Sequence, residues 1–475
     1  MNASDRPTLL SIEELSVLVS SPVRTHLAGA YRGLYPAAND PAQKLQHEQH
    51  LEKVLAAMKV SPRTSTFRVN TIRATRTEVV DKLVLAMNEW AEREGLCTPN
   101  PLPISVAAHA VLEDIVSVDI AQSPTTLSSC RIPPLQVELD TDSSFGDEAR
   151  RARRHRLGWP TTCKVIVCDR LCGEAVLRGS HVFVRGILAA DPSIRVGQAL
   201  AVYADLPQPQ RPSWPRGLAV ESYTGTCVFV GIGQACCTHA SSFDSGKASH
   251  VASFTKNQAV ILAADRSRSK VVAMKQRFLA LGCTSIVPLH LNATACCMDE
   301  PGRPRCSVAE IRAAAKVSER DGLLNVKYFF PGSFDRILLD PPCSALGLRP
   351  KLQIGPTRVD DLLAFATYQR KFVPPAVALL KPGGILTYST CTFHVEENER
   401  MVRHILDDYP VMELVPITIG VGLPGLPGHG LTTDECQRVR RFDPTDSADT
   451  MGFFIAKFRK RATTAYCNST AGSLL

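Results

Sequence analysis

Two cysteines that follow apolar strand patterns are the residues of this 475-residue sequence best placed for chemistry. Cys343 follows the apolar run that starts at Phe334 and lies in a polar loop that Asp340 opens. Cys391 comes directly after Thr390, at the end of a second apolar run. A cysteine that only filled a core would lie inside the run rather than beyond it. Because the thiolate is a strong nucleophile, both positions are candidates for covalent catalysis.

The elements that would position these cysteines alternate from about residue 247 onward. Strands are predicted over 259–264, 285–289, 335–340, 384–389 and 452–458, and helices over 269–281, 368–380 and 396–407. This alternation predicts an α/β fold with a mostly parallel sheet between layers of helices. Such sheets bind ligands at the carboxyl ends of their strands, which is where both cysteines fall.

The first part of the chain has a different texture. Residues 1–60 are predicted to be mainly helical, with a strand over 65–71 and an amphipathic helix over 75–90 after them. Residues 161–232 contain short apolar runs separated by Gly or Pro, which predicts the strands of a small β-barrel at 164–167, 175–177, 182–184, 199–203 and 227–230. The predicted domains are an N-terminal α/β region (1–115), a flexible basic insertion (116–157), the barrel (158–233), the main α/β domain (240–462) and a disordered tail (463–475).

The basic run Arg150–Arg156 within the predicted insertion could contact phosphate, although such runs are more often a solvated face. The net charge of +8 permits a polyanionic partner without proving one. Sixteen cysteines without an export signal indicate reduced thiols, and no paired CxxC motifs predict zinc. No apolar run is long enough to span a membrane. We therefore expect a cytoplasmic protein, or alternatively a nuclear one, that binds neither metal nor membrane.

The two cysteine loops carry a resemblance to a known family. Asp340-Pro-Pro-Cys-Ser and Ser389-Thr-Cys-Thr resemble the fourth and sixth motifs of the Nop/Sun-domain family of RNA cytosine-5 methyltransferases. The cysteine pair is specific, because DNA cytosine methyltransferases carry only the fourth-motif cysteine and adenine methyltransferases carry neither. The resemblance implies a Rossmann-like class I methyltransferase sheet, S-adenosylmethionine as cofactor, an RNA partner and a monomeric enzyme.

The resemblance also implies a role for each residue of the loops. Carbon 5 of cytosine becomes nucleophilic when a thiolate adds to carbon 6, and the family gives this step to the position of Cys391. Asp340 would supply a proton or hydrogen bond to ring N3, for which we expect a water-poor pocket that favours its protonated form. Cys343 would help to release the product.

A second resemblance covers the predicted barrel. The segment from Val167 to Val182 resembles the start of a PUA domain, as found in one subgroup of the family. That subgroup implies tRNA, near its acceptor end, as the substrate, with ribosomal RNA as the second choice. Arg178, Gly179 and His181 are candidate RNA contacts, and a purely structural role in the barrel stays equally open for them.

The methyl-donor motif is incomplete. Gly246 and Lys247 match only the tail of the glycine-rich donor loop, and residues 237–245 before them do not read as a strand. The later donor contacts are Asp265 for the ribose hydroxyls, Lys270 one turn on, Asn292 in place of an acid near the adenine, and Asp340.

The first central strand is thus missing, which should expose the edges of both neighbouring strands. This predicts either an incomplete gene model or weak donor binding. The intact catalytic loops favour an incomplete gene model.

Two other function classes were considered. A non-catalytic RNA-binding protein would keep the barrel and the basic surfaces but no donor site. A cysteine hydrolase is poorly supported, because only His394 follows a cysteine loop closely and it is interpreted as a loop position.

Overall fold

The structure is a computed structural model that places most of the chain. The residues it describes are 8–10, 19–34, 41–60, 62, 64–93, 104–120, 164–178, 180–182, 186–191, 194, 197–206, 214–234, 246–297, 305–317, 326, 328–354 and 358–462. No helix within these residues is both long and apolar enough to cross a membrane.

The catalytic half is built on a five-stranded sheet that carries both cysteine loops. Its order is β12-β13-β16-β14, with β15 paired to β16. β12 and β13 run parallel, so their carboxyl ends, which lead to Cys343 and Cys391, meet at one edge. The strands are β12 (Phe334–Leu339), β13 (Leu380–Thr390), β14 (Met412–Val415), β15 (Arg440–Phe442) and β16 (Phe453–Lys460). The helices around them are α10 (Val359–Arg370), α11 (Val373–Leu379), α12 (Glu399–Asp408) and α13 (Thr433–Arg438).

A separate two-stranded parallel sheet holds the predicted donor residues. It consists of β10 (Ile261–Asp265) and β11 (Ile286–His290), packed against α7 (Gly246–Phe254) and α8 (Arg268–Ala280). α9 (Val308–Val317) follows these strands. Within the described ranges β10 does not pair with β12, so the sheet is split where the missing strand was expected. Leu338 on β12 is 54% exposed.

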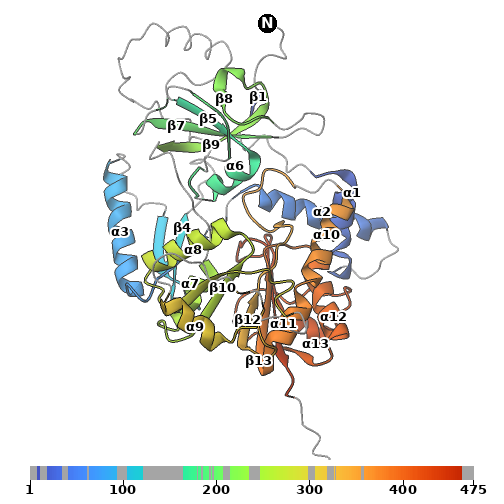
Figure 1. The fold of residues 1–475 in the computed structure, drawn as a ribbon. Helices are drawn as coiled ribbons and strands as arrows, with labels where there is room; N and C mark the ends of the chain where they lie inside the picture. Colours follow the sequence, from blue (N-terminus) through green and yellow to red (C-terminus); the bar gives the residue numbers. More distant parts are fainter. Residues whose placement is uncertain are drawn as a thin grey trace, which may run out of the picture.

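The β-rich unit, at the top of Figure 1, is an open six-stranded sheet with the order β1-β9-β7-β5-β6-β8. Its strands are β1 (Thr8–Leu10), β5 (Lys164–Cys168), β6 (Ile187–Ala190), β7 (Ala199–Asp205), β8 (Leu218–Ala219) and β9 (Thr226–Gln234). The expected closure into a barrel is not seen, because no described pairing joins β1 to β8.

Another correction concerns residues 175–177, predicted as a strand. They belong to α6 (Arg170–Leu177), which starts where the side chain of Asp169 accepts a hydrogen bond from the Cys172 amide.

The N-terminal region contributes two helices and a small sheet. α1 (Ser21–Gly29) and α2 (Pro41–Met58) pack against the segment that follows Cys343 and against Phe393 and Val395, beside α10 (Figure 1). The small sheet pairs β2 (Thr64–Arg68) and β3 (Ile104–Ala108) with β4 (Ile115–Ile120), next to α3 (Arg76–Arg93). Residues 116–120, predicted as the start of a flexible loop, are therefore a strand. The other domain boundaries stay predictions.

Candidate functional site

The two cysteines meet at the ends of β12 and β13. Their sulfurs lie 3.2 Å apart, although the residues are far apart in sequence. Both thiols are half-buried. The backbone also joins the loops, because the Gly347 amide donates to the Cys391 carbonyl at 2.9 Å. The parallel register of the two strands thus brings together the residues that the sequence singled out.

The two sulfurs have different charged and hydrogen-bonding neighbours. A hydrogen bond from Cys343, helped by the nearby Lys247 ammonium, lowers the pKa of Cys391 despite its burial. The hydrogen bond to Cys391, burial and the Glu397 carboxylate raise the pKa of Cys343. The Asp340 carboxylate opposes the lowering at Cys391, but the directions of the two shifts favour the anion on Cys391 over Cys343. This asymmetry makes Cys391 the better nucleophile.

Asp340 lies beside the cysteines and bridges two elements. Its Oδ2 contacts Lys247 Nζ at 2.5 Å, and its Oδ1 accepts a hydrogen bond from Ser389 Oγ at 3.1 Å. Lys247 is the second residue of α7, so the surviving tail of the donor motif meets the fourth-motif loop. The water-poor pocket expected around Asp340 is a wrong prediction in this structure, because its side chain is 41% exposed and contacts an ammonium group.

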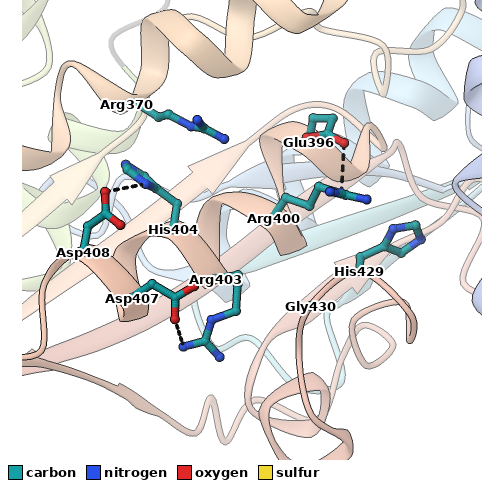
Figure 2. Close-up of a pocket in the computed structure, with 9 residues that line it drawn as sticks. All are labelled: Arg370, Glu396, Arg400, Arg403, His404, Asp407, Asp408, His429 and Gly430. Atoms are coloured by element: carbon teal, nitrogen blue, oxygen red, sulfur yellow. Dashed lines mark ion pairs between the residues drawn. The ribbon is translucent and has the colours of Figure 1, made fainter.

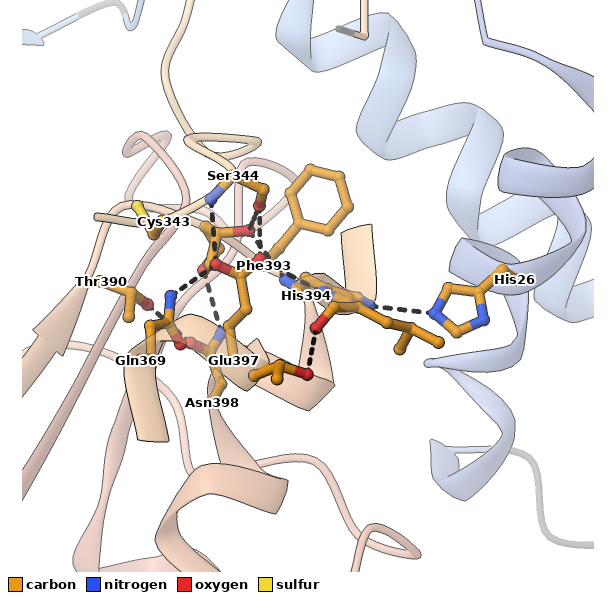
Figure 3. Close-up of polar contacts among 12 residues, drawn as sticks. His26, Cys343, Ser344, Gln369, Thr390, Phe393, His394, Glu397 and Asn398 are labelled. Carbon is orange, nitrogen blue, oxygen red and sulfur yellow. Dashed lines mark hydrogen bonds and ion pairs between the residues drawn. The ribbon is translucent and has the colours of Figure 1, made fainter. Parts of the chain in front are cut away.

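A buried carboxylate that the sequence analysis did not select joins the two loops. Glu397, on the short 3-10 helix η5 (Val395–Glu397), is fully buried. It accepts hydrogen bonds from the Ser344 amide at 2.9 Å and from Gln369 Nε2 at 2.7 Å (Figure 3). Its other oxygen contacts Ser344 Oγ at 2.5 Å and His394 Nδ1 at 3.2 Å. The only sequence signal for it was a run of polar residues directly after a buried strand.

His394 lies in a loop, as predicted, but in a buried part of it. Its side chain is buried between Glu397 and the N-terminal helix α1, where its Nε2 lies 3.0 Å from His26 Nε2. Three hundred and sixty-eight positions separate these two histidines, so no local pattern could have linked them.

The predicted donor residues fall into two groups. Asp265 and Asn292 lie at the carboxyl ends of the parallel strands β10 and β11, while Gly246 and Lys247 start α7. Asp265 Oδ1 accepts the Ser267 amide at 2.7 Å. Its Oδ2 lies 4.0 Å from Lys270. The Asp265 carboxylate is therefore suited to accept hydrogen bonds from ribose hydroxyls. The Asn292 carbonyl oxygen already accepts a hydrogen bond from the Thr294 hydroxyl at 2.8 Å, which weakens the case for an adenine contact.

The three candidate RNA contacts have different outcomes. Arg178 donates to the Pro350 carbonyl at 3.2 Å, so it ties α6 to the loop that follows Cys343. Burial lowers its pKa, partly offset by Glu174, whose Oε2 lies 4.0 Å away. His181 is exposed. Gly179 lies outside the described residues.

The pocket in Figure 2 is not this site. It lies along α12 and contains neither cysteine nor any predicted donor residue. Two of its arginines are paired with carboxylates, Arg400 with Glu396 at 2.9 Å and Arg403 with Asp407 at 2.8 Å. In the part of the chain that the structure describes, no three His, Cys, Asp or Glu side chains cluster as metal ligands.

Comparisons with known proteins agree with the site. Residues 307–459 match the model of the 16S rRNA methyltransferase RsmB/F family. The mouse tRNA (cytosine(72)-C(5))-methyltransferase NSUN6 is 29% identical over 64% of this chain and 75% of its own length. The crystal structure of NSun6 from Pyrococcus horikoshii with SFG has the same fold, with a TM-score of 0.50, 21% identity, and 92% of this chain and 97% of that chain covered.

A plant relative covers most of this chain. The Arabidopsis thaliana rRNA (cytosine-C(5))-methyltransferase NOP2C is 26% identical, with 89% of this chain and 90% of that protein covered. The alignment runs over 563 positions, more than the 475 residues of this chain. The relative therefore has residues without a counterpart here.

Proposed function

We propose, because the chain belongs to the Nop/Sun family of RNA cytosine-5 methyltransferases, that it methylates carbon 5 of cytosine in RNA. The observation that carries the proposal is the pair of sulfurs 3.2 Å apart at the ends of two parallel strands, with the pKa of Cys391 lowered. A buried structural cysteine has no need of a second thiol beside it, nor of a nearby lysine that favours its anion.

Each residue of the site has a task in this reaction. Cys391 adds to carbon 6, which makes carbon 5 nucleophilic. Asp340, held by Ser389, lies on the same side as Cys391 and is positioned to hydrogen-bond the edge of the pyrimidine ring. After methyl transfer, release breaks two bonds: carbon 5 loses its proton to a base or water, and the bond between carbon 6 and Cys391 breaks. Cys343, whose pKa is raised, keeps its proton at neutral pH and can donate a hydrogen bond to the departing Cys391 thiolate. This last step is the release role that the family resemblance implies.

The residues present fit the methyl donor only in part. S-adenosylmethionine would supply the methyl group, with Asp265 on its ribose and Lys247 near the transferred group. The backbone amides of a glycine loop, which would hold the methionine carboxylate at a helix N-terminus, have no counterpart among the described residues.

For the RNA, we favour tRNA. The supporting facts are the named substrates of the mouse and human relatives and the β-rich unit docked on the catalytic loop through Arg178. This unit would act as a PUA-type RNA-binding module, and the cytoplasm would be the place of action.

Mapping of 5-methylcytosine tests the function. Total RNA, containing both tRNA and ribosomal RNA, would be incubated with this chain at millimolar S-adenosylmethionine, which offsets the incomplete donor site, and sequenced after bisulfite treatment, with Cys391→Ala as the control. New protection of a cytosine near the acceptor end is expected only with the unaltered chain. Protection of ribosomal RNA alone would overturn the choice of tRNA.

A second function has one observation in its favour. The split between β10 and β12 removes part of the donor site, so the chain could bind RNA without methylating it. No new 5-methylcytosine, together with tRNA binding that survives Cys391→Ala, would support that alternative.

A further inference from the structure

The residues directly after the two cysteines are hydrogen-bonded to each other. Ser344 Oγ lies 2.9 Å from Thr392 Oγ1. The Thr392 oxygen accepts the His394 amide at 3.1 Å, so its hydroxyl proton is available to Ser344. The Ser344 hydroxyl in turn donates to Glu397 Oε1 at 2.5 Å. The spacing of the cysteine loops therefore depends on one buried carboxylate.

The hydrogen bonds of Glu397 fix the state of His394. The Ser344 amide, the Ser344 hydroxyl and Gln369 Nε2 all donate to the carboxylate. An ionised carboxylate is an acceptor only, so His394 Nδ1 also donates to it. With Nδ1 protonated, a neutral His394 has no proton on Nε2, so this nitrogen accepts a hydrogen bond from a neighbouring donor.

His26 is the donor of that hydrogen bond. Its Nε2 faces His394 Nε2 at 3.0 Å, a contact that needs one proton between the two nitrogens (Figure 3). Hydrogen bonds then run in one direction from His26 through His394 to Glu397. His26 is carried by α1, which the core formed with Leu346 and Phe393 holds in place. The N-terminal helix is thus connected to the cysteine loops by side chains as well as by packing.

We propose that His26 is a positioning residue for Cys343 and Cys391. Acting through His394 and Glu397, it holds the two cysteine loops at their working spacing. The inference rests on the proposed function only where it gives the spacing of the cysteines a role in catalysis. The spacing itself can be tested without methyl transfer.

Burial and the neighbouring His394 lower the pKa of His26, while Glu396 raises it and Arg400 lowers it. The folded state thus prefers the neutral ring. Because His26 already donates from Nε2, a second proton would enter at Nδ1 and leave the contact with His394 in place. The link therefore depends on the His26 side chain as a hydrogen-bond donor and not on its charge.

Disulfide trapping measures the spacing directly. The full chain would be treated with diamide, a diazene oxidant that takes two electrons and two protons from a thiol pair. The rate of Cys343–Cys391 disulfide formation would be read by mass spectrometry of the linked peptides. His26→Ala removes the link, whereas His26→Gln keeps a neutral hydrogen-bonding group at a similar reach. His404→Gln is the matched control, because His404 is partly buried but bonds only Asp408 on its own helix.

At pH 8, His26→Ala should form the disulfide on the order of tenfold more slowly, since small displacements of reacting atoms cost that much. His26→Gln and His404→Gln should match the unaltered chain. Melting curves would show that each variant is folded.

Equal rates for His26→Ala and the unaltered chain at pH 8 would overturn the proposal. Glu397→Gln is a second test of the clamp formed by Glu397, His394 and His26. If this variant folds, it should also slow formation of the Cys343–Cys391 disulfide. None of these outcomes depends on whether the protein methylates RNA.

Discussion

The roles of the two cysteines follow from what each sulfur has beside it. Cys391 has the Lys247 ammonium nearby and a thiol that donates to it, while Cys343 has the Glu397 carboxylate nearby. The sequence motifs placed both cysteines at strand ends but could not rank them by charge. The ranking needs the three-dimensional structure. Lys247 precedes both cysteines in the sequence and Glu397 follows both, so only the fold shows which cysteine each one approaches.

Exchange of either cysteine should separate attack from release. Cys391→Ala should abolish both methylation and any covalent RNA adduct. Cys343→Ala should still form the adduct but release it slowly, so that RNA-linked protein accumulates on denaturing gels. An accumulated adduct in Cys391→Ala instead would mean that the two roles are reversed.

Asp443 gives a pH-dependent contribution to stability. Burial alone would raise its pKa, but hydrogen bonds from His50 and Thr445 outweigh burial and lower it to about 2. Since an unfolded Asp titrates near 3.8, the carboxylate stabilises the fold by about 2 kcal/mol above that pH. This contribution disappears as the pH falls through the range between these two values.

The isosteric variant Asp443→Asn isolates this term. Urea unfolding at pH 7 should show a loss of about 2 kcal/mol relative to the unaltered chain, and the difference should shrink below pH 4. A difference that stays constant down to pH 3 would mean that packing, rather than charge, is affected.

At the scale of elements, the prediction from sequence was strongest where apolar runs were long. The strands that became β10, β11, β12, β13 and β16 were all predicted within a few residues. The short run at 175–177 was misjudged, because three apolar residues fit a strand or one helical turn equally well and the Asp169 cap decided for the helix. The split sheet was anticipated from the truncated motif.

The clamp of Glu397, His394 and His26 was not predictable in the same way. Its members come from η5, the preceding loop and α1, and only tertiary packing brings α1 to this place. Asp340 shows a different limit, since its neighbours were foreseen but its exposure was not.

The tight approach of Gly347 to Gly452 leads to a prediction for an element boundary. A Cβ on Gly347 would lie 1.9 Å from the Gly452 carbonyl oxygen, which belongs to the backbone just before β16. Gly347→Ala should therefore push apart β16 and the loop that contacts the Cys391 carbonyl. We expect a loss of about 1–3 kcal/mol in urea unfolding and slower disulfide trapping. Gly420→Ala, where a Cβ would meet nothing within 4 Å, should change stability by less than about 0.5 kcal/mol.

At the scale of the whole molecule, the split sheet should weaken donor binding. Each unmade hydrogen bond to a charged carboxylate costs about 1.5–3 kcal/mol, so the loss of two or three should reduce affinity on the order of a hundredfold or more. Isothermal titration of this chain with S-adenosylmethionine should show no micromolar binding. Micromolar affinity that Asp265→Ala removes would show that the remaining ribose site is sufficient.

The division into two sheets also affects how the molecule opens. A two-stranded sheet is marginally stable by itself, and β10 with β11 is joined to the catalytic half by packing rather than by shared ladder hydrogen bonds in the described ranges. The amide hydrogens of β10 and β11 should therefore exchange with deuterated solvent well before those of β13 and β16. The catalytic sheet would persist as a cooperative unit of its own while the donor half unfolds and refolds beside it.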